Sequence, residues 1–598
     1  MKHGDPLKSE HRSDWQWRIG LLVAATAFGF GAFGLWEYES AAEHGAHPDA
    51  VSVFYHTLQL FILHAPHLEH AAPWQLHVGR MLAAGLFFAA AGKAFVKVFR
   101  DELLLVRLWL PWRRGHVVVC GLGDLGLRLA LDGRKRGRFV VAIEKHSASG
   151  ALEQARACGV LVIEGDARDP AQLRRARVER AEFLVAACPD DHTNVAVASI
   201  AGQFAQREKL GAPLVCRLLI RDPELRAIVS DEALFPHTGP GYRVNFSDLD
   251  LEATAARQAL RRYPLDFESI QQDDQTAVHL VVIGFGQIGK SLALQAARIG
   301  HFANEVGGGH MQLRITVADT DPSGWNGFAS RYKNLQKVCA ADFFVHKLGD
   351  AGFISALAAL SPAAGSRLAL VTYAICIEGE EEDNNCDRTN LRLGLELSKL
   401  LAGRPARVLI HQTSSGGFAS LFPNQGRGRG LSNNIHAFGM EEGVYTWDVL
   451  LHESEDDLAK AVHENYQATS GEAGVPRWGE LPEHFKESNR QAADHIPIKL
   501  RALGYVDRPV DERTERIGRF DEKQMELLAK MEHARWCAER FLAGWEYGKP
   551  TARELKINES LVLWNELKEK DRKKDWNQIN AIPEILRLVG RGIYRKED

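Results

Sequence analysis

Two glycine-rich runs of the form G-x-G-x-x-G, each directly after a β-branched apolar run, constrain the fold of this chain most. The first run is 121–126 after 117–119, and the second is 284–289 after 281–283. In a strand–turn–helix unit, glycines at these positions allow a tight turn, the approach of a diphosphate to the backbone, and close packing of helix on strand. The chain is therefore predicted to contain two nucleotide-binding folds.

Around the first glycine run, apolar strand-like segments alternate with helical stretches. The predicted strands are 117–120, 139–143, 160–163, 183–187 and 214–219. This alternation predicts a doubly wound parallel sheet over residues 115–245. Glu144 ends the second strand, where an acidic side chain bonds ribose hydroxyls, and this favours an unphosphorylated ribose such as that of NAD or adenosine. The other interpretation is a fold that keeps its glycines for packing and has lost the ligand.

A second copy is expected over residues 276–450, after a linker at 246–275. Its glycine run is followed by a Gly-rich insertion and then by a strand at 313–318, and further strands are expected at 368–373 and 407–411. Asp319 follows the 313–318 strand and is the counterpart of Glu144, displaced by the insertion. Two interpretations stay open, a second ligand site or a degenerate copy that packs against the first. The acidic run 378–383 is expected to be a solvated loop.

The first 114 residues have the composition of a membrane segment. Residues 19–36 contain no charged side chain, and a spanning helix needs about 20 apolar residues. We expect spans at about 17–36 and 76–98; the second includes Arg80, Lys93 and Lys97, whose long side chains can reach the interface. Lysine and arginine precede the first span and follow the second, but none lies between Ile19 and Gly79. The positive-inside tendency then places both termini in the cytoplasm of a multi-pass protein of the inner (plasma) membrane, with the lipid bilayer as a partner.

Between the spans, the apolar stretch 51–63 is too short to cross a bilayer. It suits a re-entrant helix of about those bounds, as in a two-span pore subunit, or an interfacial helix in a two-span anchor. No run like the potassium filter TVGYG follows; the chain reads HAPHLEH at 64–70. The histidines of this outer region could bind metal or sense pH, but their irregular spacing favours solvated loop residues, and no metal site is predicted.

The sequence after residue 450 repeats itself. Residues 458–466 correspond to 528–536, and a further set recurs in the same order: Trp478, Glu480, Leu481, Ile496, Pro497, Leu500 and Gly504 as Trp564, Glu566, Leu567, Ile582, Pro583, Leu586 and Gly590. Two mainly helical units, 451–520 and 521–598, are therefore expected, each with two helices and a connecting arm, packed as a pair.

The motifs of the first nucleotide fold, at 116–126, 144, 164–170 and 189–194, together resemble the TrkA-N (RCK) domain that regulates conductance in potassium channels and transporters. The resemblance covers about residues 115–230 and implies NAD(H) or an adenine nucleotide bound as a regulator. It also implies a homo-oligomer, usually a tetramer of two-span subunits. The glycines and Glu144 would hold phosphates and ribose, and Asp166 with Ala167 would flank the adenine. The implied contact residues are Gly121, Gly123, Asp124, Leu125, Gly126, Glu144, Lys145, Asp166 and Ala167. In the second copy they are Gly284, Gly286, Gln287, Ile288, Gly289 and Asp319.

Residues 531–536, 544–548 and 564–567 resemble the RyR repeat of ryanodine receptors, whose bacterial relatives are appended to TrkA-N domains. Some repeats of that family are associated with nucleotides, so the resemblance implies a small-molecule nucleotide ligand here. The first unit lacks the Gly-Trp-x-Tyr-Gly element. A stacking face with cations would suit an anionic aromatic ligand, and the candidates are His533, Arg535, Trp536, Trp545, Tyr547 and Lys549. The alternative is that these aromatic side chains belong to the core.

These features predict a multidomain chain: a two-helix transmembrane region with a re-entrant helix, two α/β Rossmann-like domains and a duplicated helical RyR-like end. The leading hypothesis is a nucleotide- or small-molecule-gated ion channel or transport regulator. The alternative is a membrane-anchored nucleotide sensor or effector, in stress or phage defence, without a pore. A membrane-bound NAD-dependent oxidoreductase is disfavoured because no substrate domain with a general acid or base is evident, and a nucleotide hydrolase because no Walker lysine motif is present.

The bulk composition excludes other classes. The net charge of −4 gives no reason to expect nucleic acid as a partner. All eight cysteines follow residue 114, without a CxxC pair or a Cys/His zinc spacing, which fits a reduced cytoplasm.

Overall fold

The computed structural model describes residues 7–42, 48–64, 71–146, 150–207, 213–222, 225–226, 244–306, 309–345, 352–366, 368–379, 385–413, 434–470, 474–511 and 515–596. The chain divides into two compact units, Met1–Arg113 and Arg114–Asp598. The run 65–70, which stands in place of a filter, lies outside the described residues, as do His44 and His47 of the outer region.

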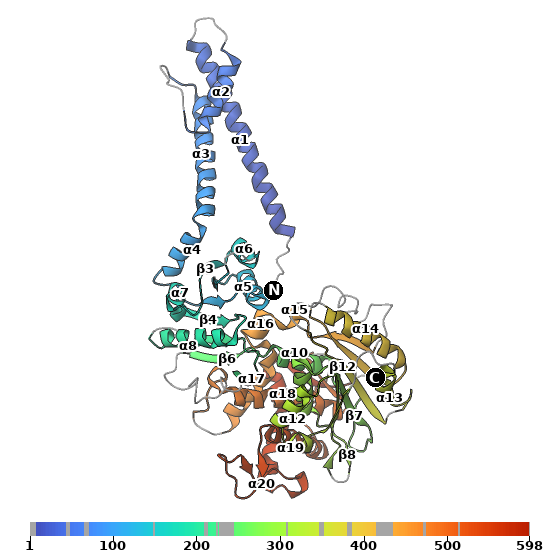
Figure 1. The fold of residues 1–598 in the computed structure, drawn as a ribbon. Coiled ribbons are helices and arrows are strands. Elements are labelled where there is room, and N and C mark those ends of the chain that lie inside the picture. Colours follow the sequence, from blue (N-terminus) through green and yellow to red (C-terminus); the bar gives the residue numbers. More distant parts are fainter. Residues whose placement is uncertain are drawn as a thin grey trace. The chain divides into compact units, whose positions relative to one another are not determined.

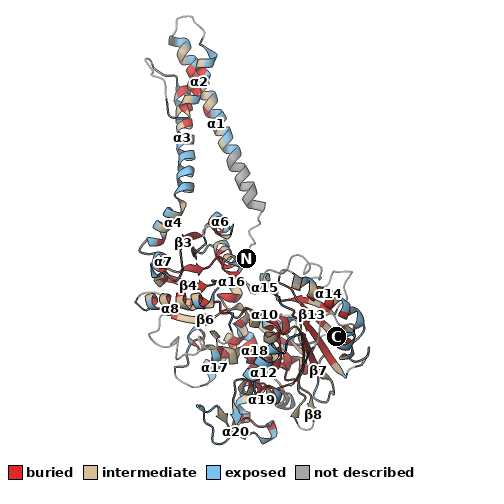
Figure 2. Cartoon of the chain, viewed as in Figure 1, coloured by how far each residue is buried: buried red, intermediate tan, exposed pale blue. Residues whose placement is uncertain are grey.

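The described part of the first unit consists of helices α1 (Leu7–Ala42), α2 (Ala50–Leu60), α3 (Trp74–Val98) and α4 (Arg100–Trp109). Within α1 and α3, the stretches Arg18–Ala41 and Trp74–Val96 are long and apolar enough to cross a membrane. Much of the described length of both helices is exposed (Figure 2). The exposed residues include large apolar ones such as Leu22 and Met81. Apolar surface of this extent requires an apolar environment or further protein around it.

Glycines let α1 and α3 approach backbone to backbone. A Cβ on Gly34 would lie 2.4 Å from the backbone N of Leu76, and one on Gly79 would lie 2.6 Å from the N of Gly31. Small residues at a crossing are the usual way in which apolar helices pack closely. Gly79 of α3 therefore lies at a packing contact with α1.

Helix α2 packs against α1 and α3 through Val53 and Leu60. Asp49 caps its first turn by accepting hydrogen bonds from the backbone N–H groups of Val51 and Ser52. The helix ends at Leu60, before the expected boundary at residue 63. Leu63 has a positive φ of 62°, which lies outside the right-handed helical region. Its position relative to a bilayer remains a prediction.

The second unit begins with a six-stranded parallel sheet, which confirms the predicted doubly wound fold (Figure 1). Its strands are β1 (His116–Cys120), β2 (Val140–Glu144), β3 (Leu161–Glu164), β4 (Ala181–Ala186), β5 (Leu214–Leu218) and β6 (Val244–Asp248). Helices α5 (Asp124–Lys135), α6 (Gly150–Ala157), α7 (Pro170–Arg175) and α8 (Asp191–Arg207) connect them. The order β3-β2-β1-β4-β5-β6 reverses direction beside β1, where such sheets bind ligands at the carboxyl ends of their strands.

A second parallel sheet has the same order, β11-β10-β7-β12-β13-β14. Its strands are β7 (Ala277–Ile283), β10 (Arg314–Asp319), β11 (Ala340–Val345), β12 (Ala369–Ile375), β13 (Ala406–His411) and β14 (Ile435–Phe438), with helices α11 (Gln287–Ile299), α12 (Ser323–Arg331), α13 (Phe353–Ala359) and α14 (Asn385–Leu400). The Gly-rich insertion contains the short pair β8 (Glu305–Val306) and β9 (Gly309–His310).

The segment 246–275, expected as a linker, holds regular structure. It contains most of β6, the edge strand of the first sheet, and helix α10 (Leu251–Arg262), which packs against α11 of the second copy. The strand escaped prediction because Asn245 and Ser247 interrupt the apolar pattern on which strand prediction depends.

Two short helices after the second sheet, α15 (Glu441–Val444) and α16 (Trp447–Leu450), pack back onto the first domain. The Trp447 ring is buried against Gly133 of α5, where a Cβ would lie 2.5 Å from it. Arg136 of α5 makes a bidentate ion pair with Asp448. The two Rossmann-like domains and the C-terminal helices therefore share one continuous apolar core.

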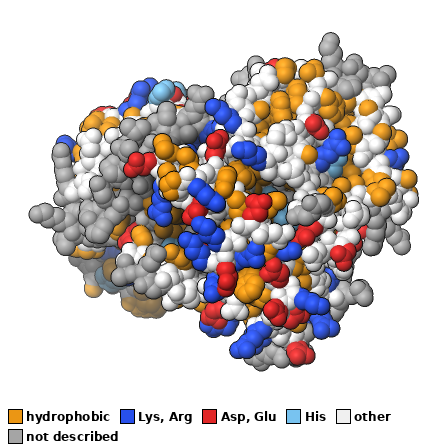
Figure 3. Space-filling model, turned by 90° about the horizontal axis from the view of Figure 1, so that it is seen from below, with side chains coloured by type: hydrophobic (Ala, Val, Ile, Leu, Met, Phe, Trp, Pro, Cys, Tyr) orange, Lys and Arg blue, Asp and Glu red, His pale blue; other side chains and the backbone are white. Residues whose placement is uncertain are grey.

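The C-terminal region contains helices α17 (Asp457–Thr469), α18 (Glu483–Ala502), α19 (Glu522–Leu542), α20 (Glu569–Asn580) and α21 (Ile582–Leu588). Strand β15 (Tyr505–Pro509) pairs antiparallel with β18 (Arg591–Arg595) and joins the two expected units. The face of the molecule seen from below mixes basic, acidic and apolar side chains (Figure 3).

Candidate functional site

The first glycine run forms a turn that only glycine fits at two of its positions. Gly121 has a φ of +90°, and a Cβ on Gly126 would lie 2.0 Å from the Gly121 carbonyl oxygen. Gly123 differs, because a Cβ there would meet nothing within 4 Å. It is the N-cap of α5, followed by Asp124 and Leu125 in the first turn, and no side chain caps this helix end. The backbone at Gly123 is thus open to a ligand, and a helix N-terminus attracts anions.

Glu144 ends β2, and its carboxylate reaches back to the glycine turn. Its Oε2 accepts from the Leu122 backbone N–H at 2.6 Å and its Oε1 from the His146 N–H at 3.0 Å. Burial raises the pKa of Glu144, but these hydrogen bonds outweigh burial, and the pKa lies below its ordinary value. The carboxylate is ionised at neutral pH, at the position where an acid bonds ribose in this fold.

Beside Glu144, the loop after β3 presents the predicted adenine-flanking residues. Arg168 makes two hydrogen bonds to the carboxylate of Asp166, at 3.1 and 2.7 Å, and holds the pKa of Asp166 well below its usual range. Lys145 Nζ lies 3.5 Å from the same carboxylate, and Ala167 is buried. The structure therefore brings together the residues predicted for the first site.

The second glycine run repeats this geometry. Gly284 has a φ of +87°, and a Cβ on Gly289 would lie 2.3 Å from the Gly284 carbonyl oxygen. Asp319 Oδ2 accepts from the Phe285 backbone N–H at 2.6 Å, as Glu144 does from Leu122. The insertion that separates Asp319 from the glycines in sequence therefore leaves its carboxylate in the equivalent place, because the insertion loops out before β10.

The two copies differ at the helix N-terminus. In the second copy, Glu378 lies just beyond β12, and its carboxylate accepts from the backbone N–H groups of Gln287 and Ile288 at 2.8 and 2.6 Å. A Cβ on Gly286 would lie 2.3 Å from Glu378 Oε2. Glu378 is exposed, as expected for a solvated loop, yet it occupies the position that a ligand phosphate takes at a helix N-terminus.

No described side chain does the same in the first copy. In the second sheet Ile283 of β7 pairs with Ile375 of β12, and in the first sheet Cys120 of β1 pairs with Ala186 of β4. Glu378 lies three residues after Ile375. Its counterpart, three residues after Ala186, is Pro189. Proline carries no acceptor side chain, and the α5 terminus has no side-chain cap among the described residues. Within the described part of the chain, the N-terminus of α5 is therefore open, whereas Glu378 occupies that of α11.

Two asparagines fix the loops at both sites, and the sequence predicted no role for either, although Asn194 ends the 189–194 motif. Asn194 Nδ2 donates to the carbonyls of Cys188 and Leu219, and Asn390 Nδ2 donates to those of Ile377 and His411. Both end an Asp-x-Thr-Asn tetrapeptide, at 191–194 and 387–390. Their aspartates also match: Asp191 accepts from backbone N–H groups of Arg221 and Asp222, and Asp387 from that of Thr413. This internal repeat is the signal that would have found them.

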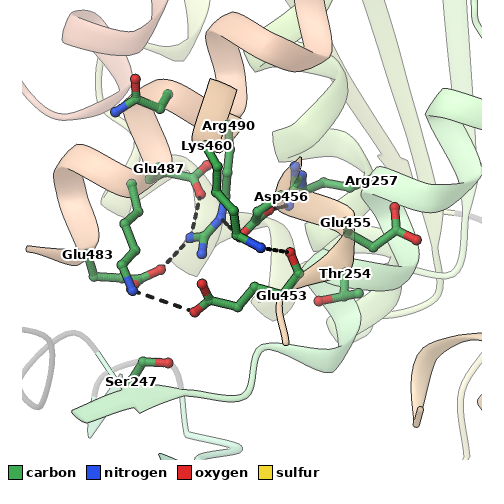
Figure 4. Close-up of polar contacts among 12 residues, drawn as sticks. Ser247, Thr254, Arg257, Glu453, Glu455, Asp456, Lys460, Glu483, Glu487 and Arg490 are labelled. Atoms are coloured by element: carbon green, nitrogen blue, oxygen red, sulfur yellow. Dashed lines mark hydrogen bonds and ion pairs between the residues drawn. The ribbon is translucent and has the colours of Figure 1, made fainter. Parts of the chain in front are cut away.

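A network of buried ion pairs joins β5 and α10 to the 451–520 unit (Figure 4). Arg257 of α10 bonds Asp456 at 2.7 Å and Asp494 at 2.8 Å. Arg490 of α18 also bonds Asp456, and Arg217 of β5 bonds Glu453 at 2.7 Å. Burial raises the pKa of Glu453, but Arg217 and Lys486 reverse the shift, and its pKa falls well below the usual range. The protein's own charged side chains therefore fill this interface.

The predicted RyR ligand residues separate into two groups. His533 and Tyr547 line a cavity of about 520 Å³ between the second Rossmann-like domain and the 521–598 unit. Arg535 does not: it is buried and bonds Glu532 and Glu539. The other three do not line this cavity either: Trp536 and Trp545 pack near the Arg540 guanidinium, and Lys549 lies over the Tyr547 ring.

Corresponding side chains of the two C-terminal units make corresponding contacts. His463 Nε2 bonds the Pro476 carbonyl at 2.8 Å, and His533 Nε2 bonds that of Val562 at 2.9 Å. The indole of Trp478 donates to Glu453, and that of Trp564 donates to Glu526, both at 2.7 Å.

Comparison with known proteins supports two of these regions. Residues 117–217 match the TrkA-N domain, and residues 505–595 match the RyR domain. The chain carries a TrkA-N domain and an RyR domain. No curated protein of similar sequence was found. The matched RyR segment begins at β15, inside the expected 451–520 unit, and includes the whole of α19 to α21.

Among solved structures, GsuK bound to ADP has a TM-score of 0.34 at 15% identity, covering 72% of this chain and 96% of that one. The GsuK channel bound to NAD has a TM-score of 0.34 at 14% identity, covering 85% and 88%. The human SLO3 gating ring has a TM-score of 0.32 at 11% identity, covering 50% and 74%.

Proposed function

We propose that this protein is a nucleotide-gated membrane channel or transport regulator that binds NAD(H) or an adenine nucleotide at its TrkA-N domain. The observation that carries the proposal is the open α5 terminus at Gly123 beside the ionised Glu144. Together these offer a phosphate position and a ribose acceptor within one matched domain. Asp124, Leu125, Lys145, Asp166 and Ala167 complete the proposed contacts.

In the second copy, we propose that Glu378 competes with any nucleotide. Gly284, Gly286, Gln287, Ile288, Gly289 and Asp319 have the matching geometry, but a diphosphate must first displace the Glu378 carboxylate from the backbone N–H groups of α11. The second copy then serves mainly as a partner of the first, held to it by α10, α15 and α16.

Binding is favoured over turnover by the chemistry of the first site. Beside the glycine turn, Cys188 is half-buried, and burial with the nearby Glu144 and Asp166 carboxylates raises its pKa to about 11. It is a poor nucleophile at neutral pH. Among the described residues, no group of three or more His, Cys, Asp or Glu is arranged to hold a metal ion. We therefore propose a regulatory ligand and no catalytic role.

The membrane part of the proposal rests on α1 and α3, which we propose to span the inner membrane with both termini in the cytoplasm. The second spanning helix continues through α4 into β1, so a shift in the first domain has a covalent route to the span. A nucleotide shifts such an equilibrium only by its differential affinity for the two states. By resemblance we propose a homotetramer, and by the matching histidine and tryptophan contacts we propose that the two C-terminal units are duplicates.

A non-conducting, membrane-anchored nucleotide sensor is the second candidate. It is favoured by one observation: the chain has no TVGYG-like run after α2. Flux measurements in liposomes separate the two, because only the channel changes its ion flux when nucleotide is added.

The test of the ligand site uses calorimetric titration of ADP and NAD into the full chain and a Gly123→Val variant. Since a Cβ at this position meets no protein atom within 4 Å, the variant should fold while blocking the diphosphate. We expect at least about 10-fold weaker binding, a loss of about 1.4 kcal/mol. Gly327→Ala, at another unobstructed glycine, is the matched control and should bind as wild type. Equal binding by the Gly123→Val protein would contradict the proposed site.

A further inference from the structure

The two interfaces between a Rossmann-like domain and a C-terminal unit are built differently. At the first, buried charged side chains meet across the interface: Arg217 bonds Glu453, and Arg257 bonds Asp456 and Asp494. At the second, the two sides are joined by polar contacts, such as Lys530 Nζ to Glu305 at 3.0 Å and Asn334 Nδ2 to the Trp545 carbonyl at 3.2 Å. Between these contacts lies the cavity of about 520 Å³, within the range of about 300–1,000 Å³ that small-molecule sites occupy.

The cavity wall is mainly apolar and partly aromatic. Helix α19 contributes Ala534, Ala538 and Phe541, and the arm before α20 contributes Leu561 and Trp564. Trp564 is held by its indole N–H, which donates to Glu526 at 2.7 Å. A fixed indole and a phenyl ring in one cavity suit a flat ligand that stacks.

Cations outnumber carboxylates in the lining. Lys337, Lys530 and His533 line the cavity, and Glu566 is the single acidic residue among the described lining side chains. Lys530 is paired with Glu305, and His533 with Asp575 at 3.4 Å. Burial opposes the charged form of His533, but its hydrogen bonds to Asp575 and Cys537 raise its pKa to about 10, so it carries a charge at neutral pH.

Lys337 stands apart from the other two cations. Its Nζ lies 5.4 Å from the centre of the Phe541 ring, and no ion pair is seen for it within the described part of the chain. An ammonium held over an aromatic wall without a carboxylate partner is available to a ligand anion.

We propose that this cavity is a second ligand site, separate from the TrkA-N site, for a small anion with a planar aromatic body. The ring system packs against Trp564 and Phe541, and the anionic group meets Lys337. The ligand would touch both the second Rossmann-like domain and the RyR domain, so its binding would favour whichever arrangement keeps the two together.

The test titrates AMP into the full chain in the presence of saturating NAD, with calorimetry and tryptophan fluorescence as readouts. We expect one AMP per chain, at least 5-fold tighter than adenosine, which lacks the anion. Lys337→Gln should weaken AMP about 5- to 10-fold. Lys333→Gln, an exposed lysine outside the lining with the same charge change, should have no effect. Ala534→Phe, which fills the cavity, should weaken AMP at least 20-fold.

Wild-type protein that binds no AMP overturns the proposal, as does AMP binding that survives Ala534→Phe in a variant with a wild-type Tm. If Ala534→Phe fails to fold, the comparison of Lys337→Gln with Lys333→Gln decides. Gly123→Val should leave AMP binding intact, so failure of the TrkA-N site and failure of this cavity give different results.

Discussion

Replacing Glu378 with alanine should turn the second Rossmann-like domain into a nucleotide site. Two backbone N–H groups of α11 now donate to its carboxylate at 2.8 and 2.6 Å. A side-chain acceptor at a helix N-terminus contributes about 0.5–2 kcal/mol, and a negative charge there about 0.3–1 kcal/mol when exposed. Since Glu378 is exposed, we take a total of about 1–2 kcal/mol that a ligand phosphate must overcome. Its removal should strengthen nucleotide binding to this domain about 5- to 30-fold.

The assay is calorimetric titration of ADP into full-length wild-type, Glu378→Ala and Glu378→Gln proteins. In an Ala534→Phe background, which fills the cavity, the protein that keeps Glu378 should bind one ADP per chain, at the first domain, and Glu378→Ala should bind two. Glu378→Gln should lie between them, because its amide oxygen still accepts but carries no charge. Glu396→Ala, an exposed carboxylate on α14, is the matched control. A folded Glu378→Ala protein that binds ADP with unchanged stoichiometry and affinity would refute the role given to this carboxylate.

Three further predictions concern titratable groups. Cys188, with its pKa raised to about 11, should react with iodoacetamide at pH 8 about 100-fold more slowly than an unperturbed thiol, and mass spectrometry should find the exposed Cys158 labelled first. Glu532→Gln should lower stability by about 3–5 kcal/mol in thermal unfolding, because the buried cations Lys499 and Arg535 then lack their shared carboxylate. Burial, with Asp250 and Glu483 nearby, raises the pKa of Asp248 to about 7, so the folded protein keeps a proton that the unfolded chain releases above pH 4. Tm should therefore fall between pH 4 and pH 7, and Asp248→Asn should flatten that fall; an unchanged slope would contradict the shift.

Much of the fold follows from local pattern in the sequence. The strands nearest the glycine runs are continuous apolar segments buried on both faces, so β1, β2, β7 and β10 were predictable. The edge strand β6 was not, since its apolar residues alternate with Asn245 and Ser247 and form no such run. Likewise the contact of α16 with α5 depends on Trp447 meeting Gly133, a pairing across several hundred residues that no local pattern contains.

The candidate sites divide in the same way. Gly121, Gly126 and Glu144 are fixed by turn geometry within one βαβ unit, and sequence spacing alone located them. In the sequence, the insertion places Asp319 farther from its glycine run than Glu144 is from the first run. In the structure, β10 pairs with β7 in the usual register, so Asp319 lies at the position equivalent to Glu144. The role of Glu378 depends on a loop from another strand reaching the glycine turn. The cavity residues likewise come from two domains, which sequence adjacency cannot bring together.

The asymmetry between the copies has a thermodynamic consequence for regulation. Suppose that both Rossmann-like domains bound nucleotide equally and that both interfaces with the C-terminal units were open. One ligand could then bind at all four sites, and the protein would respond only to the concentration of that ligand. Instead Glu378 occupies the N-terminus of α11, and buried ion pairs fill the interface with the 451–520 unit. The two sites that we propose, at the TrkA-N domain and in the cavity, therefore involve different domains. Those domains share a continuous apolar core, which offers a physical route for coupling between the proposed sites. Any coupling between the two is then reciprocal: if ADP at the TrkA-N site tightens AMP in the cavity by some factor, AMP must tighten ADP by the same factor. Titrating each ligand in the presence and absence of the other measures that factor twice, and two unequal values would show that the ligands do not bind at two linked sites.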